Sequence, residues 1–158
     1  MLFVFISGVC NRKYIRSIGW AMEADCSSRR LHTVPKGLIE NLQNLDLSGN
    51  MITEITVNDL QFPKLKILSL AGNNLSKLPA DVFRNTTQLE QLDLSGNKIT
   101  DTADAVFSCT PNLRTINGLH TISTPTNLFQ SLNRLKTLSI TMEDSELTSN
   151  IFEVNNPL

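Results

Sequence analysis

Three stretches of the chain share one pattern: LQNLDLSGNMI at residues 42–52, LKILSLAGNNL at residues 65–75 and LEQLDLSGNKI at residues 89–99. Each opens with leucine, places apolar residues at the same positions and carries asparagine at the ninth. Weaker copies open at Leu113 and Leu135, so the copies follow one another every 22 to 24 residues. This period predicts a solenoid of stacked units, because no single unit of that size can bury its apolar face alone.

The residues inside each copy follow strand geometry. Leu45 and Leu47 alternate with Asp46 and Ser48, so the period of two predicts inward leucines and outward polar side chains. The pattern is identified as the leucine-rich repeat. That resemblance implies an α/β solenoid with a curved parallel sheet on the concave side and irregular or short helical returns on the convex side.

Two further columns of the repeat have structural roles. An amide can both donate to and accept from backbone groups of adjacent turns, which predicts a structural ladder. The ladder residues are Asn50, Asn73 and Asn97. Regularly spaced apolar residues in the returns predict a stacked spine in the core rather than an aromatic ligand cage. The spine residues are Leu60, Phe83, Phe107, Phe129 and Phe152.

The last two copies depart from the template. The fourth has Gly118 at a core position and Thr121 at the ladder position, and the fifth has Glu143 and Ser145 where asparagine and an apolar residue belong. In the fourth copy, Leu119 permits an alignment shifted by one residue, and such a shift exchanges the two faces of a strand. The register of these two strands is therefore left open.

The segment before the first repeat resembles a known cap. CSSRRLHTVPKGL at residues 26–38 is similar to the last part of the N-terminal cysteine cap of extracellular leucine-rich-repeat proteins such as Toll-like receptors, Slit proteins and small matrix proteoglycans. Such caps commonly carry four cysteines, whereas only Cys10 lies upstream here. Within this resemblance we expect Cys10 to pair with Cys26 and close a small cap loop. Cys109 is then left over, either as a small buried residue or as an intermolecular bridge.

The expected organisation has three parts. Residues 1–24 hold a candidate signal segment and the start of the cap, residues 25–41 the end of the cap, and residues 42–158 the repeats. The apolar run at residues 2–9 favours a signal core but has no basic residue ahead of it, and an apolar cap strand is the alternative. Leu158 stands where a sixth repeat would open, so we expect a fragment or an incomplete gene model.

Several function classes are excluded by composition and motifs. The formal net charge of -1 provides no basic field for nucleic acid, and no apolar run approaches the ~20 residues of a membrane span. His120, Asp93 and Ser95 invite a triad interpretation, but no oxyanion donor accompanies them, and Ser95 fits the repeat pattern. We therefore expect no catalytic residue, no metal site and no cofactor. The sequons at Asn74 and Asn85 favour glycosylation on a secretory route.

Recognition is the function that is left. The outward columns of the sheet are expected to bind a protein ligand or co-receptor. The expected partner-binding residues are Asp46, Lys66, Ser69, Glu90, Asp93, Arg114, Asn117, Lys136 and Ser139. The sequence thus predicts a non-catalytic extracellular module, part of a receptor, adhesion molecule or secreted regulator. A glycan-bearing matrix protein and a cytosolic repeat scaffold are the alternatives, and a solvated sheet face without a partner is a further one.

Overall fold

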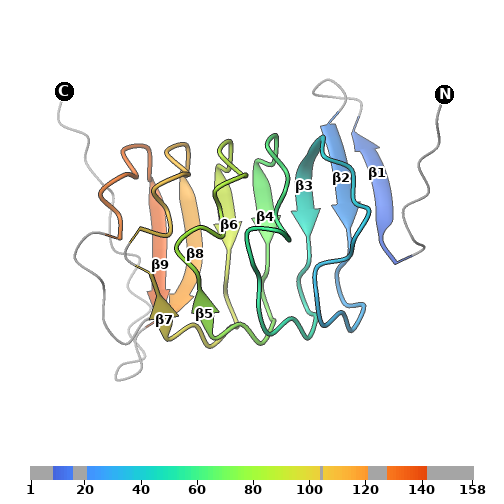
Figure 1. Cartoon of the computed structure of the whole chain (residues 1–158), viewed down its shortest axis with the longest axis horizontal. Helices are drawn as coiled ribbons and strands as arrows, with labels where there is room; N and C mark the ends of the chain where they lie inside the picture. The colour runs from blue at the N-terminus through green and yellow to red at the C-terminus, as the bar shows by residue number, and fades with distance from the viewer. Residues whose placement is uncertain (1–8, 16–20, 104, 121–127, 142–158) are drawn as a thin grey trace.

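The chain forms a row of stacked turns whose strands lie side by side (Figure 1). The structure is a computed structural model, and it describes residues 9–15, 21–103, 105–120 and 128–141. The main sheet has seven strands in this order: β1 (Asn11–Ile15), β2 (Ala21–Asp25), β3 (Leu42–Asp46), β4 (Ile67–Ser69), β6 (Gln91–Asp93), β8 (Thr115–His120) and β9 (Thr137–Thr141). A second, two-stranded sheet pairs β5 (Lys77–Leu78) with β7 (Asp101–Thr102). The predicted parallel solenoid is confirmed, with about five turns.

The inward leucines stand in one register along the sheet. Leu45 pairs with Leu68, Leu68 with Leu92 and Leu92 with Ile116, and all four side chains are buried. A parallel strand cannot satisfy its own backbone groups, so each turn depends on the next for its hydrogen bonds as well as for its core. Within the described residues, the returns form turns and short extended segments.

The ladder asparagines tie successive turns together through their side-chain amides. Asn73 Oδ1 accepts a hydrogen bond from the Ile52 N–H at 3.0 Å, and Asn73 Nδ2 donates to the Leu47 oxygen at 3.0 Å and to the Leu70 oxygen at 2.9 Å. Asn73 therefore bridges two turns from a buried position. The same type of bridge is made by two other residues, Asn50 and Asn97.

We expect Asn73→Ala to lower the free energy of unfolding by about 1–3 kcal/mol, the cost of leaving one buried polar group, here the Ile52 N–H, without a partner. The Leu47 and Leu70 oxygens still accept from Asn50 and Asn97. Asn58→Ala is the matched control, because Asn58 is exposed on a return and an exposed truncation stays within about 0.5 kcal/mol. Urea unfolding of the two variants and the parent measures both values. Equal losses in the two variants would show that the ladder amide contributes no specific stability.

The apolar spine is stacked along the convex returns. Phe83 and Phe107 are fully buried, and their ring centroids lie 5.9 Å apart with an interplanar angle of 13°. Phe107 and Phe129 continue the stack at 6.4 Å and 14°. Leu60 is buried as well, whereas Phe152 lies outside the described residues. The spine thus runs through at least three neighbouring turns.

The cap contributes two strands that the repeat pattern does not predict. β2 lies parallel to β3, with Ala24 opposite Leu45, and β1 lies antiparallel to β2. The structure joins Cys10 to Cys26, the preferred pairing, with an S–S distance of 2.05 Å. β2 crosses the boundary expected between residues 24 and 25, so the sheet begins before the cap motif. The proposed signal core falls almost wholly on residues 1–8, outside the described residues.

A β-bulge resolves the register of the fourth repeat. Ile116 pairs with Leu138 and Leu119 pairs with Ile140, so β8 uses one residue more than β9 between these two pairs. Gly118 lies at this irregularity with φ +67, and a side chain there would run into the backbone of Ser95. Leu119, and not Gly118, fills the core position. Thr121, Glu143 and Ser145 lie outside the described residues.

Candidate functional site

The candidate site is the outward face of the seven-stranded sheet, which we call the concave face. Because its strands are in register, residues from different repeats form columns across it. The carboxyl-end column consists of Asp25, Asp46, Ser69, Asp93 and Asn117. The middle column consists of Glu23, Asn44, Ile67, Gln91, Thr115 and Thr137. The amino-end column consists of Gln43, Lys66, Glu90, Arg114 and Lys136, whose backbones are joined by hydrogen bonds of 2.8 Å. Its last four residues directly precede β4, β6, β8 and β9, so the column lies at the edge of the sheet.

The middle column is absent from the residues expected at the sequence level. Its signal was available, because an inward Leu45 requires both neighbours, Asn44 and Asp46, to point outward. Ile67 is the exception among otherwise polar side chains, with 36% of its surface exposed. Ile67 is therefore the apolar side chain that this otherwise polar column exposes.

The carboxyl-end column is held by short local hydrogen bonds. Asp93 Oδ1 accepts from the Ser95 N–H at 2.9 Å and from Ser95 Oγ at 2.6 Å, and Asp46 Oδ1 accepts from the Ser48 N–H at 2.8 Å. In the cap, the side-chain and backbone hydrogen bonds of Ser27 lower the pKa of Asp25. Within the described residues, Oδ2 of these three carboxylates has no hydrogen bond. One oxygen fixes the carboxylate, and the other makes no hydrogen bond within the described part of the chain.

The same bonds bear on the triad interpretation. The Ser95 hydroxyl donates to Asp93, so the pair is a local turn that recurs in the cap as Ser27 and Asp25. A nucleophilic serine needs a histidine base that accepts its proton, and the His120 side chain lies outside the described part of the chain. The geometry therefore assigns Ser95 and Asp93 to the repeat scaffold.

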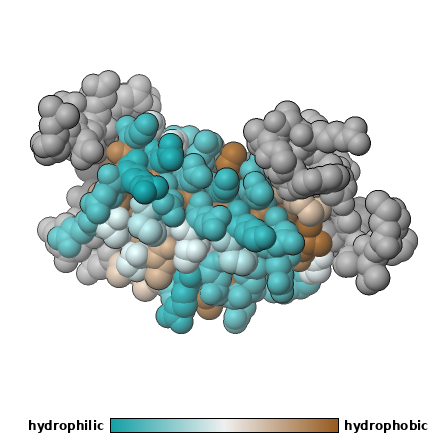
Figure 2. Space-filling model, turned by 90° about the horizontal axis from the view of Figure 1, so that it is seen from above, coloured by the Kyte–Doolittle hydropathy of each residue, from teal (hydrophilic) through white to brown (hydrophobic). Residues whose placement is uncertain are grey.

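The amino-end column carries the opposite charge. Arg114 Nε lies 3.5 Å from Glu90 Oε2 in a partly exposed ion pair, while Lys66 and Lys136 are exposed beside it. The column is therefore net positive, whereas the carboxyl-end column holds three carboxylates. Viewed onto the amino ends of the repeat strands, the described surface is mostly hydrophilic (Figure 2). The concave face thus separates positive from negative charge, with Ile67 between the two columns.

The flanks of the solenoid hold the sequons and the third cysteine. Asn74 is exposed and Asn85 is half-buried, and neither lies on a strand of the main sheet. Cys109 is half-buried on the return after Phe107, with its sulfur 3.8 Å from Ser108 Oγ. Cys109 is thus half-buried rather than fully buried, and Ser108 before it is exposed.

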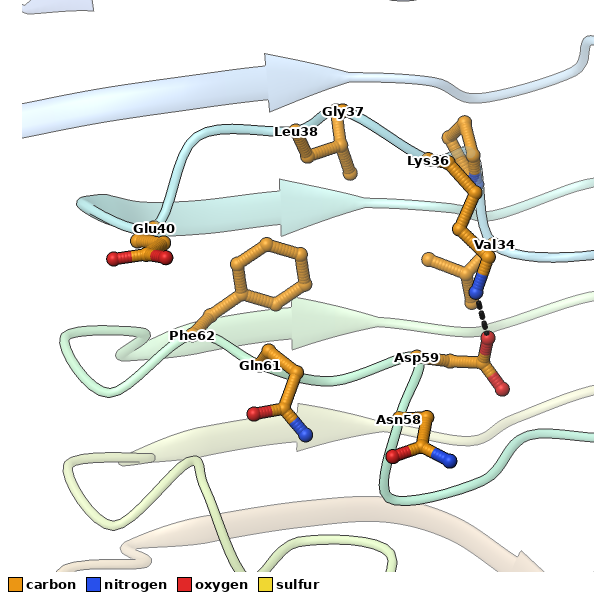
Figure 3. A pocket seen from close by; sticks show the side chains of 10 residues that line it. Val34, Lys36, Gly37, Leu38, Glu40, Asn58, Asp59, Gln61 and Phe62 are labelled. Carbon is orange, nitrogen blue, oxygen red and sulfur yellow. Dashed lines mark hydrogen bonds and ion pairs between the residues drawn. The ribbon is translucent and has the colours of Figure 1, made fainter.

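A small cavity lies away from the concave face, between the cap return and the return of the first repeat (Figure 3). Its volume is about 180 Å³, and buried Val34 and Phe62 line it together with more polar residues. Lys36 Nζ and Asp59 Oδ1 form an ion pair of 2.8 Å beside it. Burial raises the pKa of Asp59, but hydrogen bonds from Lys36 and Thr56 outweigh this effect, so the pKa is lowered. The ion pair between Lys36 and Asp59 therefore links the cap to the first repeat.

We expect this link to weaken in acid. Because the folded-state pKa of Asp59 lies below its ordinary value of 3.8, its stabilising contribution is complete above the unfolded-state pKa and is lost as the pH falls through the folded-state pKa. Asp59→Asn should therefore destabilise the protein at neutral pH and much less at about pH 2. Urea unfolding of parent and variant at both pH values measures this difference. A difference that is the same at both pH values would contradict the assignment.

Residues 9–15, 21–103, 105–120 and 128–141 contain no group of three or more histidine, cysteine, aspartate or glutamate side chains placed to hold a metal ion. Among those same residues, no helix has the length and apolar character needed to cross a bilayer.

Known proteins share the repeat pattern of this chain. A family model described as leucine rich repeat matches residues 63–117, and a second, described as leucine rich repeats (2 copies), matches residues 40–85. Mouse Toll-like receptor 9 is 30% identical over 114 residues, which cover 69% of this chain and 11% of that protein. Human oligodendrocyte-myelin glycoprotein is 34% identical over 83 residues, which cover 52% of this chain and 19% of that protein. The chain therefore spans a small part of the curated relatives.

A solved structure shows the same fold. The crystal structure of human trophoblast glycoprotein matches with a TM-score of 0.62 at 22% sequence identity, over 85% of this chain and 53% of that chain. The match supports the solenoid architecture at an identity too low to carry binding residues from one protein to the other.

Proposed function

Because this chain is a leucine-rich-repeat protein related to extracellular receptors and glycoproteins, we propose that it is a non-catalytic extracellular module that binds a protein ligand or co-receptor through its concave face. The observation that carries this proposal is the layout of that face. Ile67 offers apolar contact, and columns of opposite charge run on either side of it. Interfaces commonly combine a central apolar anchor with charged surroundings that orient the partner.

The layout defines the chemistry of the partner. A fitting surface places an apolar side chain over Ile67 and basic groups opposite Asp46 and Asp93. It also places acidic groups near Lys66 and Lys136 on the other side. Two columns of opposite sign admit such a partner in one orientation and repel it when it is reversed, so the charges supply specificity as well as attraction.

The extracellular part of the proposal rests on the cap and the sequons. The disulfide between Cys10 and Cys26 is of a kind that persists in oxidising compartments and is rare in the cytosol. Asn74 is an exposed sequon residue on the flank, so a glycan there would leave the concave face open. We also propose that the cap ends at residue 41 and that the repeats begin at residue 42.

A glycan-bearing matrix protein is the second candidate, favoured by two sequons within 12 residues of each other. It differs from the first candidate in requiring no partner on the concave face. Screening the secreted protein against an array of secreted and cell-surface proteins separates them. The screen is run in parallel with the double variant Asp46→Lys and Asp93→Lys. A partner that binds the parent and not the variant supports recognition, and partners that bind both equally would refute the use of this face.

A further inference from the structure

Met51 is one of two large apolar side chains exposed in the described part of the chain, and 41% of its surface is open. The other, Ile67, lies on the concave face. Met51 does not, because it follows the ladder residue Asn50 after the chain has left β3. Met51 does not belong to the buried core, and it lies in no column of the concave face.

The backbone places Met51 beside a sequon on the next turn. The Met51 N–H donates to the Leu31 oxygen at 2.8 Å, and one turn later the Asn74 N–H donates to the Ile52 oxygen at 2.9 Å. Both residues directly follow a ladder asparagine, so they occupy the same position on adjacent turns. The hydrogen bond from Asn74 to Ile52, the chain neighbour of Met51, holds the two turns together here and brings Met51 within reach of a sugar attached to Asn74.

The sequon itself is well placed for modification. The Asn74 side chain is exposed, and Ser76, two residues on, is exposed too. Leu75 between them is fully buried, so the core holds the backbone of the sequon in a fixed position. A sugar on Asn74 therefore starts from a defined point rather than from a mobile loop.

We propose that Asn74 carries an N-linked glycan whose first N-acetylglucosamine packs against Met51 and covers it. This inference rests on the proposed function for its secretory route. In the transfer, Asn74 Nδ2 bonds to C1 of the first sugar of a lipid-pyrophosphate-linked oligosaccharide, the lipid pyrophosphate leaves, and the displaced amide proton goes to a base. The unbranched thioether of Met51 adapts its shape to the C–H face of the sugar ring.

In this proposal the two exposed apolar residues, Met51 and Ile67, have different roles. Met51 lies beside a sequon and is covered, whereas Ile67 lies on the sheet with the sequons on the flanks. The glycan thus covers the exposed apolar side chain on the flank. It leaves Ile67, on the concave face, accessible to a partner. On the turn after Asn74, the same position is held by Lys98, whose N–H donates to the Leu75 oxygen at 3.0 Å.

Oxidation of Met51 tests the contact directly. The full chain is expressed behind a secretory signal in eukaryotic cells, as the parent and as Ser76→Ala, which removes the sequon but keeps Asn74. Hydrogen peroxide transfers one oxygen to the thioether and leaves water, and mass spectrometry follows the sulfoxide at Met51 and at Met22. Because oxidation follows exposure, we expect Met51 to react about two- to fivefold more slowly in the parent, with Met22 unchanged as the internal control.

Enzymatic trimming locates the protecting sugar. Cutting the glycan back to a single N-acetylglucosamine should keep Met51 protected, and complete removal should abolish the protection. Equal Met51 rates in the glycosylated parent and Ser76→Ala would overturn the packing. A secreted protein with sugar on Asn85 and none on Asn74 would overturn the site while leaving the proposed function intact. Sugar on neither asparagine would overturn the site and the extracellular assignment together.

Discussion

Replacing Phe107 by alanine should lower the free energy of unfolding by about 3–5 kcal/mol, the range found for truncation of a buried phenylalanine. Phe107 is fully buried and stacks on Phe83 on one side and on Phe129 on the other. In a solenoid, the interface between neighbouring turns supplies much of the stability. The substitution removes contacts at two such interfaces at once, so its effect should exceed that of the ladder variant Asn73→Ala.

Phe107→Leu is the matched control for this result. Leucine keeps an apolar side chain in the spine and occurs there naturally as Leu60. Phe107→Leu should therefore lower the free energy of unfolding clearly less than Phe107→Ala does. Equilibrium unfolding in urea, with the Cys10–Cys26 disulfide intact, gives both values. If Phe107→Ala and Phe107→Leu lowered the free energy of unfolding equally, the stacked spine would contribute no specific stability to the core.

Features carried by a residue type at a fixed position were predictable from the sequence. The inward leucines, the ladder amides and the spine each recur with the period of the repeat, so several copies support each assignment. β1 and β2 were not predicted, because the cap strands do not repeat the motif and their pairing depends on β3. The same reason applies to Gly118, since two alignments of the fourth repeat satisfied the pattern and only the pairing with β9 separates them.

The candidate site shows the same limit. The outward residues Asp46 and Lys66 were identified from the pattern, but Ile67 was not, although the inward Leu68 beside it already places Ile67 outward. The separation of charge also depends on register, because it joins residues 21 to 24 apart in sequence into one column. For Cys109 the sequence left two alternatives open, because free cysteine is commonly buried but the exposure of a single turn is decided by local packing.

The strongest test of the concave face replaces its apolar anchor by a charge. Once the array screen has supplied a partner, Ile67→Glu should weaken its binding by about thirtyfold or more, since a central apolar contact is worth about 2 kcal/mol or more in many interfaces. The melting temperature should change little, because Ile67 is exposed and outside the core. Calorimetric titration of parent and variant measures the affinity, and thermal unfolding verifies the fold.

Met51→Glu is the matched control, because it places the same charge on the other exposed apolar residue, away from the concave face. It should leave the affinity unchanged. Asp46→Asn and Asp93→Asn, which keep the Oδ1 acceptor of each local turn, should reduce the salt dependence of association, since salt screens exposed charges. If Met51→Glu weakened binding while Ile67→Glu did not, the partner would bind the flank, and the columns of the sheet would be a solvated surface without a ligand.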